Sequence, residues 1–489
     1  MSQSTQESPQ PAARAGALDR YFRITERGST VGREVRGGLV SFFAMAYIVV
    51  LNPLILGSGE DVTGARLSIP EIAAVTAFTA GVMTVLFGAI ARYPFAFATG
   101  LGINSLVAVT IAKQVTWAEA MGLIVIEGLI IVVLAVSGFR KAVFDAIPAD
   151  LKAAIAVGIG LFIAMIGLVD SGFVRRLPDA ANTTVPVGLG IDGSIASWPT
   201  AVFVFGLLLC GVLVARRVRG GLFIGIVVTT VVAAIVEAVT KAGPSFVDGK
   251  PVPTGWSLAV PGIPDSLGGL PNLSLIGQVD LIGAFTRIGP LAASLFVFTL
   301  LLANFFDAMG TFTGLGKEAG LADAEGNLPG MKTALIVEGV GAVAGGLTSS
   351  SSNTVFVESA AGIAEGARTG LANIVTGGLF LLAMFLTPLY AVVPVEAAAP
   401  ALVVVGALMI SQITHIDFTR FEVALPTFLT MVAMPYTYSI ANGIGIGFIA
   451  WVVLATATGK GRQVHPLLWA VAIAFLVFFA IGPITAALS

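Results

Sequence analysis

Charged side chains are scarce in this sequence. Only 11% of its 489 residues are Asp, Glu, Lys or Arg, whereas a soluble domain carries about 25%. Because so little charge cannot coat a soluble surface of this size, the composition predicts that lipid surrounds most of the chain. The formal net charge of −2 also argues against a nucleic-acid partner, which would require a basic surface.

Cysteine and histidine are nearly absent. The single cysteine, Cys210, excludes an internal disulfide framework. The two histidines, His415 and His465, cannot build a zinc site with one distant cysteine. The sequence therefore predicts neither metalloenzyme chemistry nor a cofactor. Residues 1–36 are too polar for the apolar part of a secretory signal, and we expect them to form a tail.

Long apolar runs dominate the rest of the chain, and most approach the roughly 20 residues that cross the hydrocarbon of a bilayer. Seven precede and seven follow a Pro- and Gly-rich segment at 242–285, and one more covers 466–488. The sequence thus predicts an all-α integral membrane protein of fourteen spans, in which 466–488 is either a further span or a peripheral helix. The fourteen runs lie at about 37–56, 72–91, 95–112, 117–137, 150–169, 199–216, 220–241, 288–310, 333–348, 353–366, 369–392, 397–412, 424–439 and 440–458.

The two sets of seven runs are expected to form an inverted repeat. An odd number of spans in each half gives the halves opposite orientations, as in many transporters. A proline, an apolar residue and an acid stand at 148–150 before the fifth run and again at 394–396 before the twelfth. When the two halves are aligned on these tripeptides, Gly160 matches Gly406. The third run of each half is short and interrupted by polar residues and glycine. We therefore predict two broken helices at symmetric positions.

The positions of the arginine residues predict how the protein is oriented in the membrane. Residues 14–36 hold six Arg, and basic residues next to spans are enriched on the cytoplasmic side. The tail is therefore expected in the cytoplasm and the segment 242–285 outside the cell, in a multi-pass protein of the plasma membrane.

One acid, Asp307, interrupts the eighth run. Asn304 lies three residues before it and Thr311 four residues after it, so the three share one helix face. A stripe of amide, carboxylate and hydroxyl can bind a polar heterocycle or a proton. Because an ionisable group in the bilayer costs at least about 2.5–3.5 kcal/mol, we favour a functional role over a structural acid bonded to neighbouring backbone.

A second polar centre lies in the tenth run. Residues 354–357 favour an extended strand, and small residues after Glu358 and Ser359 favour a short helix that begins there. A carboxylate at this position would meet free backbone N–H groups. An unwound segment in mid-membrane favours a binding site over an ordinary N-cap at the membrane surface. Phe356 beside it is able to stack on a planar ring.

The third run repeats this plan with an extended stretch, glycines and then a helix. Gly100 and Gly102 would let a ligand approach the backbone, and Asn104 offers both a donor and an acceptor. A helix cap is the alternative interpretation of Asn104. Three further acids within apolar runs are interpreted as structural groups or proton relays, namely Glu127, Glu237 and Glu338.

These motifs resemble those of the azaguanine-type hypoxanthine/guanine/adenine permeases, a branch of the nucleobase–ascorbate transporter superfamily. The resemblance covers nearly the whole chain from Tyr21 onward. It rests on the opening residues 21–31 and 45–53, Gly100-Leu101-Gly102-Ile103-Asn104, Phe305-Phe306-Asp307-Ala308-Met309-Gly310-Thr311, Val357-Glu358-Ser359-Ala360-Ala361-Gly362, and Gly366-Ala367-Arg368-Thr369-Gly370-Leu371.

The resemblance implies purine nucleobase uptake by proton symport, with sodium less favoured as the coupling ion, and often a homodimer. It implies a core domain at 37–137 and 286–392 and a gate domain at 138–241 and 393–489, which move past each other like an elevator. By motif position it implies substrate contacts at Asn104, Asp307 and Glu358. Asp307, which has no second acid on its helix face, and Glu358 are the candidates for proton coupling. The substrate site would also include Gly102, Asn304, Phe356 and Ser359.

The sequence departs from the family's pattern at two places. Asn304 stands where the family often has a second acid, and Thr99 stands where it often has proline. The first departure removes one carboxylate from the predicted site. The preferred purine and the coupling ion therefore stay open.

An anion transporter and an intramembrane enzyme are the two alternative functions. An anion transporter of the same fold, of the sulfate or bicarbonate type, would need an electropositive site, whereas the two polar centres here carry acids and no intramembrane Lys or Arg. An intramembrane enzyme would need a nucleophile with a base or a metal, and no such constellation surrounds Asp307 and Glu358. Both alternatives rank below the permease.

Overall fold

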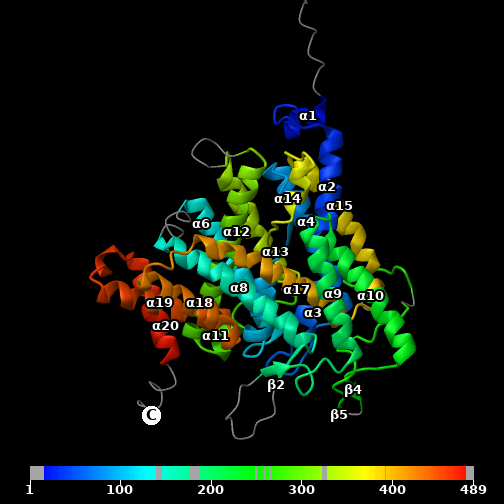
Figure 1. Ribbon diagram of the computed structural model, residues 1–489. Helices are drawn as coiled ribbons and strands as arrows, with labels where there is room; N and C mark the ends of the chain where they lie inside the picture. The colour runs from blue at the N-terminus through cyan, green and yellow to red at the C-terminus, as the bar shows by residue number, and fades with distance from the viewer. Residues whose placement is uncertain are drawn as a thin grey trace, which may run out of the picture.

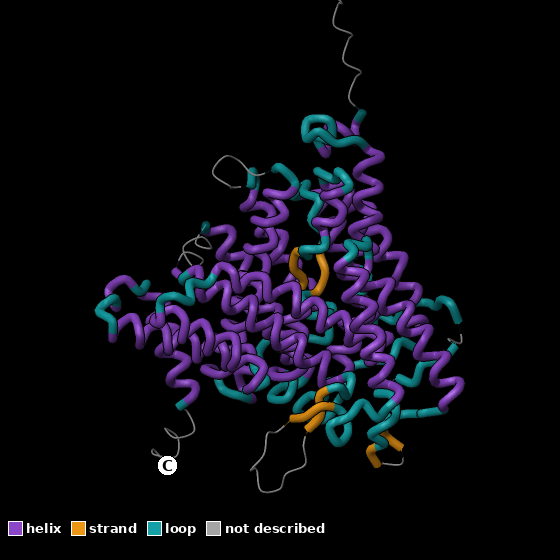
Figure 2. Tube along the Cα trace, viewed as in Figure 1, coloured by secondary structure: helices purple, strands orange, loops and turns teal. Residues whose placement is uncertain are grey.

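The computed structural model describes residues 16–138, 146–176, 187–247, 250–257, 259–263, 266–321, 328–390 and 392–480. These residues form a largely helical molecule with three short pairs of strands (Figures 1 and 2). Helix α1 and the helix α20 lie toward opposite ends of the view in Figure 1. The expected 1–36 tail is partly helical, and its residues 1–15 lie outside the described part of the chain.

In the described part of the first half, α1 is followed by the helices of the first seven predicted spans, with strands between some of them. Its elements are α1 (Ala17–Phe22), α2 (Val31–Met45), α3 (Ile48–Ser58), α4 (Ile69–Ile90), β1 (Phe97–Thr99), α5 (Leu101–Leu106) continued by a π-helical turn (Val107–Ile111), α6 (Trp117–Ser137), α8 (Ala149–Asp170), β2 (Val174–Arg176), β3 (Val187–Leu189), α9 (Trp198–Ala215) and α10 (Gly221–Thr240). The first span begins at Val31 rather than near Gly37, because the side chain of Thr30 caps α2 by accepting a hydrogen bond from the Arg33 N–H.

The segment between the halves carries β4 (Phe246–Val247), β5 (Lys250–Pro251) and α11 (Gly283–Arg287). The second half then contains α12 (Pro290–Glu318), α13 (Met331–Leu347), β6 (Asn353–Val355), α14 (Ser359–Ala364), α15 (Gly370–Ala383), α16 (Thr387–Tyr390), α17 (Val395–Met409), α18 (Phe421–Tyr436), α19 (Ile440–Ala457) and α20 (Pro466–Phe479). Each predicted run contains at least one of these helices, and the first, third, tenth and eleventh runs are each divided between two or more elements.

Nine helices within the described residues are long and apolar enough to cross a membrane, which confirms an all-α membrane protein. Four shorter apolar helices include the broken third span at Leu101–Ile111 and the C-terminal helix at Pro466–Phe479. The total of fourteen spans stays a prediction. Helix α20 packs against α12 and α19, and the end of the predicted 466–488 run lies outside the described residues.

The helices pack in a pattern that repeats between the two halves. Helix α4 packs against α15 as α6 packs against α13, and α9 pairs with α10 as α18 pairs with α19. These contacts are equivalent when the first seven spans are laid in order over the second seven, which is the arrangement of an inverted repeat. Helices α8 and α17 pair with each other. They cross at the two register-matched glycines, where a Cβ on Gly406 would lie 2.4 Å from the carbonyl oxygen of Gly160.

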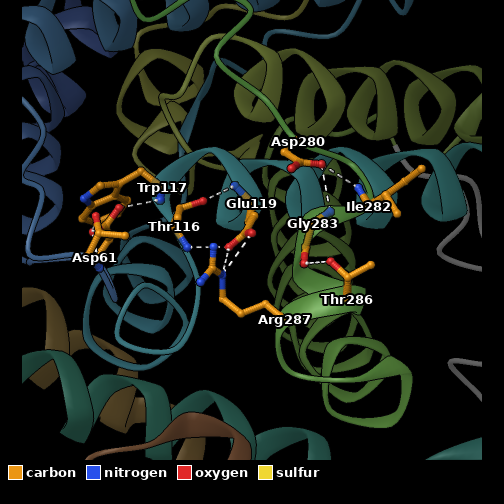
Figure 3. A network of polar contacts seen from close by, with 10 residues as sticks. Asp61, Thr116, Trp117, Glu119, Asp280, Ile282, Gly283, Thr286 and Arg287 are labelled. Atoms are coloured by element: carbon orange, nitrogen blue, oxygen red, sulfur yellow. Dashed lines mark hydrogen bonds and ion pairs between the residues drawn. The ribbon is translucent and has the colours of Figure 1, made fainter.

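A polar network fixes the loops at the start of α6 (Figure 3). The carboxylate of Glu119 accepts from the backbone N–H of Thr116 at 2.7 Å and from Nε of Arg287, also at 2.7 Å. Asp61 accepts from the backbone N–H of Trp117 at 3.1 Å. The backbone N–H groups of Gly283 and Ile282 donate to Asp280 and hold the pKa of that carboxyl below its usual value. These contacts tie α6 to α11, which lies directly before α12, and so help to set where α12 enters the core.

Close packing between α4 and α15 yields a test of the fold. A Cβ on Gly377 would lie 2.6 Å from the Gly81 carbonyl oxygen, whereas a Cβ on the adjacent Gly378 would meet nothing within 4 Å. We expect Gly377→Ala to destabilise the protein by about 1–3 kcal/mol, because the helices must separate. Gly378→Ala should be neutral or slightly stabilising, since alanine suits a helix better than glycine. Thermal unfolding of the purified variants measures both, and equal shifts would contradict this packing.

Candidate functional site

The two interrupted spans meet in the middle of the molecule as an antiparallel pair of strands. Strand β1 pairs with β6 so that Phe97 faces Val355, Ala98 faces Thr354 and Thr99 faces Asn353. Figure 2 shows this pair at the centre of the molecule, while the other strands lie at one end. Backbone bonds from Phe356 to Ala96 at 2.9 Å and from Gly100 to Ser352 at 3.1 Å extend the ladder.

Each strand leads directly into a short helix, as the sequence predicts. Helix α5 begins at Leu101 after Gly100, and α14 begins at Ser359 after Glu358. Because the strands are antiparallel, the two helices leave the strand pair from opposite ends, and both have their N-termini at it. The strand pair is thus a small polar backbone feature enclosed by helices.

Hydroxyl groups complete the hydrogen bonding of β1. The Oγ1 of Thr84 accepts from the Phe97 N–H at 2.9 Å and donates to the Phe97 carbonyl oxygen at 3.1 Å. The Oγ of Ser359 accepts from the Ala96 N–H at 2.9 Å. Unsatisfied backbone groups are expensive away from water, so these side chains are needed where the strand has no second neighbour. The structure therefore gives the predicted site residue Ser359 a backbone partner.

Glu358 occupies the N-cap position of α14, and its side chain makes no capping bond to that helix. Its Oε1 instead accepts a hydrogen bond from the hydroxyl of Tyr47. Tyr47 is buried and lies between α2 and α3, where the first span is interrupted. This carboxylate thus makes no capping bond to α14, and the Tyr47 hydroxyl is a donor to it that the sequence did not suggest.

Sequence reasoning missed Tyr47 as a candidate functional residue. The only signal was its position in the first span, within the apolar stretch 45–53. Nothing local indicated its partner, since Tyr47 and Glu358 are 311 residues apart in the chain.

Asp307 lies on α12, which packs against β6, α5 and α14. Its side chain is exposed and that of Glu358 is half-buried. The charges of Asp307 and Glu358 are close enough to interact, and Glu338 on α13 also acts on Asp307. The structure thus brings together the two acids that the sequence singled out, with Tyr47 beside them.

Asn304 lies on the same helix as Asp307 but is fully buried. Its amide nitrogen donates to Oε1 of Glu127 on α6 at 2.7 Å and to Oγ of Ser352 at 3.1 Å. These bonds join α12 to α6 and to the residue before β6. Asn304 is therefore held in a network behind the two acids, and Glu127 has a partner that the sequence did not suggest.

The three remaining predicted residues line the same region in different ways. Asn104 is buried in the first turn of α5, where its Oδ1 accepts from Oγ1 of Thr99 at 2.5 Å. Gly102 faces α8, because a Cβ there would lie 2.6 Å from Cγ2 of Ile159. Phe356 is buried and belongs to the main hydrophobic core.

No group of three or more His, Cys, Asp or Glu residues that could hold a metal ion occurs in the described part of the chain. Two surface clefts of about 390 and 530 Å³ contain none of the predicted site residues in their linings. The arrangement at the strand pair offers carboxylate acceptors and hydroxyl and amide donors. These groups suit the binding of a polar ligand.

Comparison with known proteins places the chain among transporters. Residues 32–446 match a family model, Xan_ur_permease, described as a permease family. The guanine/hypoxanthine permease PbuG of Bacillus subtilis is 37% identical over 468 residues, which cover 94% of this chain and 98% of that protein. The adenine permease AdeP of Escherichia coli is 33% identical over 94% of this chain and 96% of its own length.

Solved structures share the fold at low sequence identity. The transmembrane domain of the cyanobacterial bicarbonate transporter BicA matches with a TM-score of 0.57 at 15% identity, over 86% of this chain and 97% of that one. Murine Slc26a9 in the inward-facing state matches with a TM-score of 0.57 at 12% identity, over 93% of this chain and 74% of that one. Identities this low concern the fold alone. The family match and the relatives above 30% identity over nearly the full length establish that this chain belongs to the nucleobase–ascorbate transporter family of permeases and is a membrane transporter rather than an enzyme.

Proposed function

We propose that this protein takes up purine nucleobases together with protons, and that its core moves past its gate like an elevator. The relatives named above are guanine/hypoxanthine and adenine permeases. The observation that carries the proposal is that Asp307 and Glu358, whose charges interact, both lie beside the two broken spans. We further propose that the protein lies in the plasma membrane with its N-terminus in the cytoplasm, in line with the arginines of residues 14–36.

The chemistry of a purine base matches these acids. A purine carries N–H donors, and an ionised carboxylate is an acceptor only. Tyr47 occupies one oxygen of Glu358, which leaves the other oxygen for an N–H of the base. An inorganic anion would instead be repelled by two carboxylates. The same acids therefore favour a neutral heterocycle over sulfate or bicarbonate, although proteins of this fold include a bicarbonate transporter.

Ligand-induced stabilisation tests the substrate class. A ligand that binds only the folded protein stabilises it by about 2.7 kcal/mol at one hundred times its Kd. We expect hypoxanthine, guanine or adenine to raise the unfolding temperature of the purified protein, while the corresponding nucleosides do not. A shift with sulfate or bicarbonate, and none with any nucleobase, would refute the proposal in favour of an anion transporter.

Proton coupling follows from the two neighbouring acids. Two like charges in a region of low dielectric repel each other, so a proton on Asp307 removes repulsion that would oppose an ionised Glu358. Asp307 is the more exposed of the two acids. The hydroxyl of Tyr47 donates to Glu358 and not to Asp307. We therefore assign the coupling proton to Asp307 and the principal substrate contact to Glu358.

Two amide substitutions separate these roles. Asp307→Asn should abolish uphill uptake and retain counterflow, because the neutral amide imitates a permanently protonated acid. Glu358→Gln should weaken binding by about ten- to a hundredfold, the effect of losing a charged acceptor worth about 1.5–3 kcal/mol. Uptake and counterflow in proteoliposomes, together with binding measurements, provide the readout.

Glu60→Gln is the matched control, since Glu60 is exposed and forms a surface ion pair with Arg66. It should change neither transport nor affinity. Uphill uptake by Asp307→Asn, or parental affinity in Glu358→Gln, would contradict the assignment.

The elevator rests on a proposed division into two bodies. The core comprises α2–α6 with α12–α16, and the gate comprises α8–α10 with α17–α20. Extensive helix packing lies within each body, as between α6 and α13 or between α8 and α17, whereas contacts between the bodies are sparse. One such contact joins Gly220, before α10, to Phe43 on α2. Another is the ion pair between Arg219 and Glu365.

A cross-link tests the motion. A Cβ on Gly220 would lie 3.4 Å from Cβ of Phe43 and 2.9 Å from the Phe43 carbonyl oxygen, at a φ of +67°. The two Cβ atoms are close to the separation of about 3.5–4.5 Å in disulfides, and the reduced double variant, which carries the same strain, is the reference. In a Cys210→Ala background, Phe43→Cys with Gly220→Cys should lose uptake on oxidation and regain it on reduction, because the gate can no longer slide past the core.

The control pair lies within the gate. A Cβ on Gly167 of α8 would lie 3.1 Å from Cβ of Leu402 on α17 and 2.9 Å from the Ala399 carbonyl oxygen, so this pair introduces a similar backbone contact. Gly167→Cys with Leu402→Cys should keep transporting after oxidation. Full transport by the oxidised Phe43–Gly220 pair would exclude the elevator.

A further inference from the structure

Thr99 and Asn104 form a buried polar pair at the junction of β1 and α5. Thr99 is the last residue of β1, and Asn104 lies in the first turn of α5. Both side chains are completely buried, and Oγ1 of Thr99 lies 2.5 Å from Oδ1 of Asn104. The amide nitrogen Nδ2 of Asn104 has no hydrogen-bond partner within the described residues.

The hydroxyl proton of Thr99 determines which way this amide faces. A buried hydroxyl needs an acceptor for its proton, and Oδ1 of Asn104 is the acceptor that this side chain has. With the amide reversed, Thr99 would accept from Nδ2 and its own proton would lose this acceptor. The favoured orientation therefore keeps the oxygen of Asn104 on Thr99 and leaves the N–H₂ group unpaired.

An unpaired buried donor requires an explanation. Nδ2 of Asn104 is closed to solvent in this conformation. An acceptor on a ligand admitted beside the strand pair would supply the missing bond. Thr99 faces Asn353 at one end of the strand pair, and Glu358 follows β6 at the other end. A base held across the strand pair would meet the carboxylate acceptor from one side and the amide N–H₂ donor from the other.

We propose that Thr99 is a specificity-determining, positioning residue, which holds Asn104 as a hydrogen-bond donor toward an unprotonated ring nitrogen of the purine. This inference rests on the proposed function and deepens it. Glu358 accepts from an N–H on one edge of the base, and Asn104 donates to a ring nitrogen on another. Thr99 acts only through Asn104, and a proline at this position would not be able to do so because it has no hydroxyl.

Deaza analogues, in which one ring nitrogen is replaced by C–H, identify the acceptor. We take hypoxanthine and its 3-deaza, 7-deaza and 9-deaza analogues and measure the Kd of each for the parent and for three variants. In the parent, one analogue should bind about tenfold more weakly than hypoxanthine, the upper range for a neutral hydrogen bond. In Thr99→Ser, which keeps the hydroxyl, the same analogue should show the same penalty.

The other two variants should change that ratio. In Thr99→Val the amide is free to turn, so the penalty should fall to about twofold or less. In Asn104→Asp a carboxylate faces the ring nitrogen, so the deaza analogue should bind as well as hypoxanthine or better. Each result is the ratio of the Kd for the analogue to the Kd for hypoxanthine, measured on one variant. A smaller fraction of folded protein affects both measurements alike and leaves this ratio unchanged.

Three results would overturn the inference. They are an unchanged penalty in Thr99→Val, an unchanged penalty in Asn104→Asp, and equal binding of hypoxanthine and all three analogues by the parent. In each of these the parent still binds purines, and the proposed function stands. Failure of the parent to bind any purine would refute the proposed function and this inference together.

Discussion

Backbone hydrogen bonding away from water is the constraint on which the rest of this structure depends. A span that unwinds inside a membrane leaves N–H and C=O groups that no lipid can satisfy. Here two spans unwind at matched positions and satisfy each other, because β1 pairs with β6. The inverted repeat makes this possible, since it brings the third span of each half to the same place with opposite direction. The break in each helix is thus stable only in the presence of the other.

The same constraint explains why the polar side chains gather where they do. Thr84 and Ser359 complete the bonding of β1, and Asn304 donates to Ser352 before β6. Once polar groups are required at the strand pair, acids can be held there with partners, as Tyr47 holds Glu358. The hydroxyl of Tyr47 comes from the break in the first span, so three interrupted helices contribute to one region. Glycines at the crossings of α4 with α15 and of α8 with α17 let the surrounding helices close around it.

Hydrophobic runs and their interruptions in the sequence predicted the spans and the two broken helices, because these features depend on neighbouring residues. Apolar runs located the spans, and the interruptions before Gly100 and Glu358 located both strands and the helices after them. The register that matched Gly160 with Gly406 predicted a pair that meets at a helix crossing. Contacts between distant segments were beyond such reasoning. The bond from Asn304 to Glu127 spans 177 residues and depends on how α12 packs against α6. The start of α2 was misplaced because a single capping residue, Thr30, adds a turn to a helix whose apolar run begins later.

The central claim is that a purine binds beside the strand pair, between the acids of α12 and α14. The most direct test is an experimental structure of the protein with a bound purine base. The account predicts density for the base next to β1 and β6, with a ring N–H within hydrogen-bond distance of the Glu358 carboxylate. A base bound between α8, α17 and the other gate helices, with no contact to Asp307 or Glu358, would contradict it.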